Sequence, residues 1–116
     1  MSRLTSGVAA DTAHLPVPYE AVPLDQVVAG SPLTRAVDLD DASGRVVGIW
    51  EHTPGVSRDV EADEVFVVLA GDATIEFEDP ALPPIVLRPG SIVRLEDGMR
   101  TVWTVRETLR KVYIAP

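Results

Sequence analysis

Three side chains of this sequence could handle protons or a polar ligand, and each lies at or between two apolar stretches. Glu64 opens the run "EVFVVLA", His52 ends the run "RVVGIWEH", and Arg58 lies in the polar segment between them. Carboxylates and histidines act as general acids and bases, and an arginine supplies a permanent positive charge. The residue types therefore predict acid–base chemistry or polar-ligand binding, provided that the fold brings them together.

Strand alternation indicates which neighbours share a face with these residues. In regular strands Phe66 lies on the face of Glu64, and Trp103 on the face of Thr101. The residues that we expect to line a ligand site are Trp50, Arg58, Glu64, Phe66, Thr101 and Trp103. Glu64 and His52 are the candidates for a catalytic role.

Four of these residues also have a purely structural interpretation. Trp103 can serve as core packing, Glu64 and His52 as solvated groups at strand ends, and Arg58 as a solvated loop residue. An open interior with converging polar groups would favour binding or chemistry. An interior filled by the large apolar side chains would favour a structural role.

The elements that must position these residues are short strands. Ten prolines and eight glycines interrupt the chain, and clusters such as "DDASG" and "DPALPP" mark turns. About eight strands follow Leu33, and the last two are expected in "RTVWTV" and "TLRKVYI". Residues 53–62 are expected to be a polar loop and Gly71 a tight turn between two strands. The pattern predicts an all-β fold, an antiparallel jelly-roll barrel over residues 31–116. Residues 1–30 are expected to form an arm with one short helix in "PLDQVVAG".

Several signatures support the same fold by resemblance. They are Trp50-Glu51 before Pro54-Gly55, Glu64 before Gly71, Pro89-Gly90, Gly98, and the tail from Val102 to Tyr113. Together they resemble the short single-domain cupins, more narrowly those related to (S)-ureidoglycine aminohydrolase and the ethanolamine-utilisation cupins. The resemblance covers about residues 30–115. It implies a cupin barrel, and it leaves the reaction open because cupins support many chemistries.

Metal-binding cupins carry a His-x-His motif followed by a glutamate and a glycine, and a histidine in a second motif. Against that pattern, Glu64 and Gly71 match, whereas Arg58 and Val60 stand near the first two histidine places and Thr101 at the third. Arginine and valine cannot ligate a divalent cation, and threonine is a poor ligand at neutral pH. We therefore expect no metal and no other cofactor.

The function that we expect first is metal-independent binding of a small molecule in the barrel. This could include enzyme activity of an acid–base type, such as isomerisation, cyclisation or dehydration. The alternative is a non-catalytic binding, sensing or accessory module. A third hypothesis is a metal-dependent cupin with a shifted ligand set made of Glu64, His52 and His14.

Composition limits the partners. The net charge is −8 and the isoelectric point about 4.5, so an acidic surface argues against nucleic acid. No apolar run approaches the roughly 20 residues that cross a bilayer, so we expect no membrane span and a cytoplasmic location. The arm and the open sheet edges need cover, which predicts a homodimer.

Overall fold

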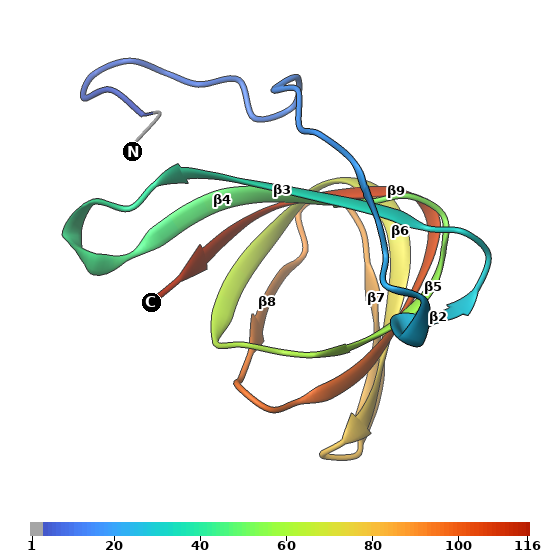
Figure 1. Ribbon diagram of the computed structural model, residues 1–116. Helices are drawn as coiled ribbons and strands as arrows, with labels where there is room; N and C mark the ends of the chain where they lie inside the picture. The colour runs from blue at the N-terminus through green and yellow to red at the C-terminus, as the bar shows by residue number, and fades with distance from the viewer. Residues whose placement is uncertain (1–3) are drawn as a thin grey trace.

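Antiparallel strands form most of the ordered structure in residues 4–116, the part of the chain that the computed structural model describes (Figure 1). The strands are β1 (Glu20–Ala21), β2 (Val27–Ala29), β3 (Leu33–Asp40), β4 (Val46–His52), β5 (Gly55–Val60), β6 (Glu64–Asp79), β7 (Leu82–Leu87), β8 (Ile92–Leu95) and β9 (Arg100–Ala115). Two short 3-10 turns, η1 (Leu24–Gln26) and η2 (Ala42–Gly44), complete the set. No helix in the described residues is long and apolar enough to cross a membrane.

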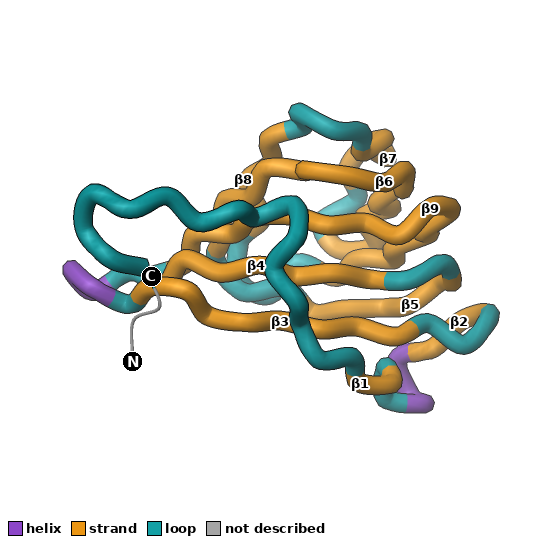
Figure 2. The backbone as a smooth tube through the Cα atoms, turned by 90° about the horizontal axis from the view of Figure 1, so that it is seen from above, coloured by secondary structure: helices purple, strands orange, loops and turns teal. Residues whose placement is uncertain are grey.

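The two longest strands, β6 and β9, pair along almost their whole length and form the centre of the sheet. On the side away from β6, β9 pairs with β4 through residues 109–115 and with β5 through residues 100–105. On the side away from β9, β6 pairs with β8 and β7. The sheet curls into a barrel, with β3 and β1 continuing it beyond β4 (Figures 1 and 2). The predicted all-β antiparallel barrel is confirmed.

The structure corrects three local expectations. The segment 53–62 is not a loop, because it contains β5, which pairs with the first six residues of β9. The two strands expected in the tail are one continuous strand, β9. The expected helix in residues 23–30 is a single 3-10 turn followed by β2.

Gly71 is not a hairpin turn but an irregularity inside β6, where the pairing with β9 shifts register. Its φ of +104° lies in the region that favours glycine. A Cβ added here would lie 2.4 Å from the carbonyl oxygen of Thr108, so the close approach of β9 also requires glycine. The irregularity changes which residues face inward: Phe66 and Val68 before it, Ala73 and Ile75 after it.

One hydrophobic core fills the deeper part of the barrel. Its buried members are Phe66, Val68, Ala73, Ile75, Leu87, Leu95, Trp103, Val105 and Leu109. A second, smaller cluster of Val17, Leu39 and Ile49 lies on the outer face of β3 and β4. Each large apolar side chain buried in this way contributes roughly 1.5–3 kcal/mol of transfer free energy. The large core holds the strands rigidly where they reach the candidate site.

The arm, residues 4–19, crosses the outer face of β3 and β4 (Figure 2). Beneath it, Arg35, Glu51 and Arg110 are direct neighbours across β3, β4 and β9. Both guanidiniums donate to the same carboxylate oxygen of Glu51, at 2.8 Å each. We call these three residues the Arg–Glu–Arg row.

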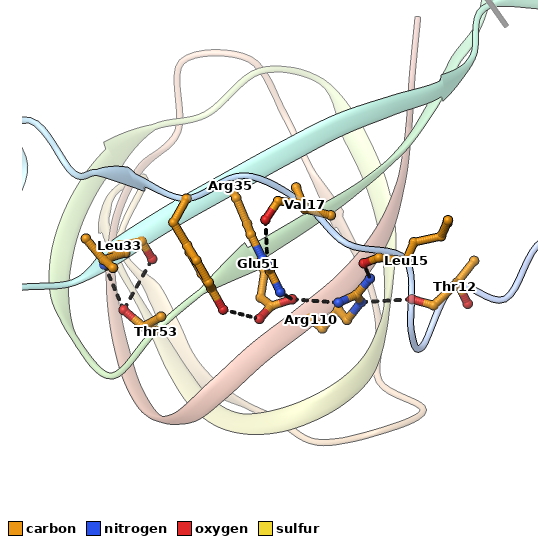
Figure 3. Close-up of polar contacts among 9 residues, drawn as sticks. Thr12, Leu15, Val17, Leu33, Arg35, Glu51, Thr53 and Arg110 are labelled. Carbon is orange, nitrogen blue, oxygen red and sulfur yellow. Dashed lines mark hydrogen bonds and ion pairs between the residues drawn. The ribbon is translucent and has the colours of Figure 1, made fainter. Parts of the chain in front are cut away.

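The Arg–Glu–Arg row holds the arm mainly through backbone carbonyls (Figure 3). Arg110 donates to the carbonyl oxygen of Thr12 at 2.8 Å and to that of Leu15, and Arg35 donates to that of Val17. The hydroxyl of Tyr19 also donates to the second oxygen of Glu51, at 2.7 Å. The arm is therefore attached to the sheet through residues 12–19, which precede β1 in the chain.

Candidate functional site

A cavity of about 290 Å³ opens between the inner faces of β4, β5, β6 and β9. Its polar and aromatic lining consists of Trp50, Asp59, Glu61, Glu64, Trp103, Lys111 and Tyr113. The interior is therefore not completely filled by the core, and charged groups converge on the space that remains. An open interior with converging charged groups favours binding or chemistry over a purely structural role.

Lys111 forms the centre of the lining. Its Nζ lies 2.7 Å from Oε1 of Glu64, and the two side chains are only 5 % and 15 % exposed. The same ammonium lies 4.2 Å from the ring centroid of Phe66, 4.7 Å from Trp50 and 5.0 Å from Trp103. These distances are within the range of cation–π attraction. The charge of Lys111 is thus balanced by one carboxylate and surrounded by three aromatic faces.

Glu61 forms the second polar centre of the cavity. The loop after β5 fixes its backbone, because Glu61 donates to the carbonyl of Met99 and accepts from the N–H of Gly98, both at 2.8 Å. Its Oε2 accepts hydrogen bonds from Thr101 Oγ1 at 2.6 Å and from Trp103 Nε1 at 2.9 Å. Both donors stabilise the ionised form.

Burial has the larger effect on Glu61 and raises its pKa above the ordinary 4.5, and the nearby charge of Asp59 acts in the same direction. Asp59 lines the cavity at its solvent-exposed mouth, and desolvation raises its pKa as well. The cavity thus contains two carboxyl groups that hold protons more strongly than usual. Such groups are candidates for exchanging a proton with a ligand.

Tyr113 completes the wall on the side of β3. Its hydroxyl donates to Oδ1 of Asp38 at 2.7 Å. Burial and this hydrogen bond raise the pKa of Tyr113, so its phenol stays protonated. Its hydrogen is already used by Asp38, and the phenol oxygen remains as an acceptor.

The predicted catalytic candidate His52 is buried rather than exposed at the barrel mouth. Its Nδ1 lies 2.6 Å from the carbonyl oxygen of Thr53, and its Nε2 lies 2.9 Å from Oγ of Ser57. A carbonyl can only accept, so Nδ1 carries the proton and Nε2 accepts from the serine. Burial lowers the pKa of His52, which keeps the ring neutral. The ring lines a smaller pocket of about 110 Å³ that shares Trp50 and Trp103 with the main cavity.

The structure corrects the placement of Arg58. Its side chain is 61 % exposed and its Nε lies 3.7 Å from a carboxylate oxygen of Glu78, outside the cavity. Along β5, Ser57 is buried and Asp59 lines the cavity, whereas Arg58 and Val60 are exposed; Val60 also borders the cavity, and Arg58 borders the smaller pocket beside His52. The positive charge beside Glu64 therefore comes from Lys111.

The other predicted residues are brought together. Trp50, Glu64 and Trp103 line the cavity, Phe66 packs beneath Lys111, and Thr101 is fully buried against Glu61. The sequence pattern did not predict that Asp59, Glu61 and Lys111 line the cavity. For Lys111 a signal existed, since an uninterrupted β9 puts Lys111 on the face of Trp103 by simple alternation.

The residues do not fit a cupin metal centre. The ammonium of Lys111 lies beside Glu64, the one ligand place that the sequence retains, and would repel a cation there. The shifted set is not assembled either, because His14 lies on the exposed arm and bonds Asp11 at 2.7 Å, while His52 is bonded at both ring nitrogens. Among residues 4–116 no three His, Asp or Glu side chains are grouped closely enough to hold a metal ion.

Comparison with solved structures finds the same fold in several proteins. A protein of unknown function from Pseudomonas syringae pv. tomato str. DC3000 is 20 % identical with a TM-score of 0.74, and the match covers 91 % of this chain but 46 % of the other. The EutQ protein of Clostridium difficile is 16 % identical with a TM-score of 0.62, covering 72 % and 68 %. A protein of unknown function from Acidithiobacillus ferrooxidans NCIB8455 is 22 % identical with a TM-score of 0.59, covering 91 % and 98 %.

These identities are low enough that the likenesses establish the fold alone. The chain spans about half the length of the Pseudomonas protein. No curated protein matches the sequence. The sequence does match the family of the EutQ-like cupin domain over residues 39–113, which is more than half of the chain. This chain is therefore a member of the EutQ-like cupin domain family.

Proposed function

We propose that this cupin binds a small polar molecule in the cavity between β4, β5, β6 and β9 without using a metal ion. The observation that carries the proposal is the position of Lys111. Its ammonium occupies the centre of the barrel, paired with Glu64, while about 290 Å³ of lined space remains beside it. A built-in cation there replaces the charge that a metal would supply, and leaves room for a ligand.

Within this proposal, Glu61 is the residue best placed to exchange a proton with the ligand. Its Oε2 is held by Thr101 and Trp103, so its geometry is fixed, and its raised pKa moves it toward neutral pH. Glu64 is less available, because its Oε1 is already paired with the ammonium of Lys111. Proton transfer of this kind would support isomerisation, cyclisation or dehydration. The motifs of the tail support a finer relationship to the (S)-ureidoglycine aminohydrolase subgroup.

A non-catalytic binding module is the second candidate. The hydrogen bonds of His52 favour it, because Thr53 and Ser57 occupy both ring nitrogens and leave neither free to act as a base. A base held in this way is a structural element of the β4–β5 connection. The two candidates differ in whether a bound molecule is released unchanged.

Intrinsic fluorescence provides the test, because both tryptophans of the chain, Trp50 and Trp103, line the cavity. We expect small polar molecules to shift the emission equally before and after treatment with a chelator. Ala36→Phe, which adds a ring to the cavity wall, should abolish the response. Val86→Phe, at an exposed position of β7, should not. A response that is lost on chelation and restored by added metal would contradict metal independence. Analysis of the recovered molecule separates catalysis from simple binding.

A further inference from the structure

We propose that the cavity selects small organic cations, primary alkylammonium ions in particular, over neutral and anionic molecules of the same size. This inference rests on the proposed binding function and adds the chemical class of the ligand. It is carried by the balance of charge in the cavity, by its aromatic walls and by the acceptors that face the remaining space.

The balance of charge is the first step. Three carboxyl groups line the cavity, those of Asp59, Glu61 and Glu64, against the single ammonium of Lys111. Lys111 is paired directly with Glu64, and it acts on Asp59 and Glu61 only through charge interactions without a direct ion pair. Among the described residues no other lysine or arginine lines this cavity. A positively charged ligand would restore the balance, whereas an anion would add to the excess of negative charge.

The aromatic walls are the second step. The three rings around Lys111, at 4.2 to 5.0 Å, show that this wall already accommodates an ammonium group. The indoles of Trp50 and Trp103 also line the open part of the cavity. Aromatic faces attract cations, most strongly where water is excluded. A second ammonium would be repelled by Lys111, and the carboxylates of Asp59 and Glu61 in the same lining offset that repulsion on the open side of the two indoles.

The free acceptors are the third step. Glu61 is 7 % exposed, and both of its hydrogen bonds use Oε2. Within residues 4–116 no hydrogen-bond donor is found for its other oxygen, Oε1. The phenol oxygen of Tyr113, whose hydrogen goes to Asp38, is also an acceptor. Among residues 4–116 the one buried side-chain atom without a partner is Nε of Arg35, so these two acceptors are within reach of water, which the three N–H donors of a primary ammonium can replace.

Size is consistent with this class. A volume of about 290 Å³ holds on the order of ten water-sized groups at roughly 30 Å³ each. An alkylammonium of four or five heavy atoms fits with room for bound water. Binding a cation between Asp59 and Glu61 should also favour their ionised forms, against the desolvation that raises their pKa values. The other titratable groups that face this site are Glu64, Lys111 and Tyr113.

The experiment compares n-butylammonium, n-butanol and butyrate at constant ionic strength, followed by tryptophan fluorescence. We expect butylammonium to bind at least about tenfold more tightly than butanol, a difference of about 1.4 kcal/mol, and butyrate to bind most weakly. Glu61→Gln and Asp59→Asn should each remove most of this preference. The matched control Glu76→Gln, at an exposed position of β6, should leave it unchanged.

The outcomes separate the two proposals. If butanol or butyrate binds as tightly as butylammonium, the selectivity is wrong while the binding function stands. If butylammonium binds but neither Glu61→Gln nor Asp59→Asn alters the preference, the assigned carboxylates are wrong. If none of the three molecules changes the fluorescence, both the selectivity and the binding function are contradicted.

Discussion

Lys111 on β9 and Glu64 on β6 form an ion pair of 2.7 Å inside the barrel, with almost no access to solvent. Removing one member of a buried pair leaves the other charge uncompensated, which typically costs about 3–5 kcal/mol. We expect Lys111→Met to lower the free energy of unfolding by this amount in urea denaturation. The double variant Lys111→Met/Glu64→Gln should recover much of the loss. Equal destabilisation in the single and double variants would contradict the pairing.

The buried carboxyl of Glu61 should make stability depend on pH in a defined direction. Because burial raises its folded pKa above 4.5, its contribution to stability is complete below pH 4.5 and is lost as the pH rises through the folded pKa. We expect Glu61→Gln to be more stable than the parent at pH 7, with the gain shrinking toward pH 4.5. Thermal unfolding between pH 4 and 8 measures this. Glu76→Gln is the exposed control, and a gain that instead grows in acid would contradict the burial of Glu61.

Glu51 should control the attachment of the arm. Burial opposes its charge, but the hydrogen bonds from Tyr19 and Arg35 outweigh this and hold its pKa below 4.5. Its contribution is therefore present above pH 4.5 and lost as the pH falls through the folded pKa. Glu51→Ala should cost about 3–5 kcal/mol, since it leaves Arg35 and Arg110 without their carboxylate.

The same variant should speed hydrogen exchange in residues 12–19, measured by mass spectrometry of peptic fragments. Glu20→Ala, an exposed position on β1, is the control and should leave exchange in this segment unchanged. Unchanged protection of residues 12–19 in Glu51→Ala would show that the hydrophobic contacts of Val17 suffice to hold the arm.

Trp103 and Arg58 should differ sharply in their effects on stability. Trp103 is buried and its indole donates to Glu61, so Trp103→Ala should cost about 3–5 kcal/mol. Arg58 is exposed and its ion pair with Glu78 is loose, so Arg58→Ala should change stability by no more than about 0.5 kcal/mol. Denaturant melts that rank the two in the opposite order would contradict the register of β5 and β9.

A homodimer remains a proposal for this chain. The short edge strands β1 and β2 leave backbone groups open, and Leu33 and Val28 beside them are exposed apolar residues. Pairing of two such edges would cover them. Light scattering at micromolar concentration should give twice the mass of one 12.5 kDa chain. A mass near 12.5 kDa at all concentrations would rule the dimer out.

The barrel was predictable because its signals are local. Turn clusters and alternating apolar residues identify strands, and the run from Ala73 to Phe77 alternates cleanly. Strand continuity was not predictable in the same way. Gly71 is a turn residue by type, but here it allows β9 to approach β6 closely, and that depends on a partner some 37 residues away in the chain.

The candidate site was predictable for residues whose role follows from one strand, such as Glu64 and Trp103. It was missed where pairing between distant strands decides the geometry. Asp59 and Glu61 lie in a polar segment that becomes ordered only through its contacts with β9 and the turn that precedes it. Alternation applies only to strands, so an expected loop over residues 53–62 gives no means of telling the cavity-lining Asp59 from its neighbour Arg58.

The arginines of the Arg–Glu–Arg row bind the arm through backbone carbonyl oxygens, and every residue type has such an oxygen. Thr12 and Leu15 are held through their carbonyls, so substitutions at these two positions keep the attachment, provided the backbone path is unchanged. These contacts therefore depend on the side chains of the two arginines and the glutamate, and not on the side chains of Thr12 and Leu15. Relatives of this chain should therefore preserve the anchor while the tethered segment diverges beyond alignment. The family match over residues 39–113 includes Glu51 and Arg110, and it begins after both Arg35 and the arm.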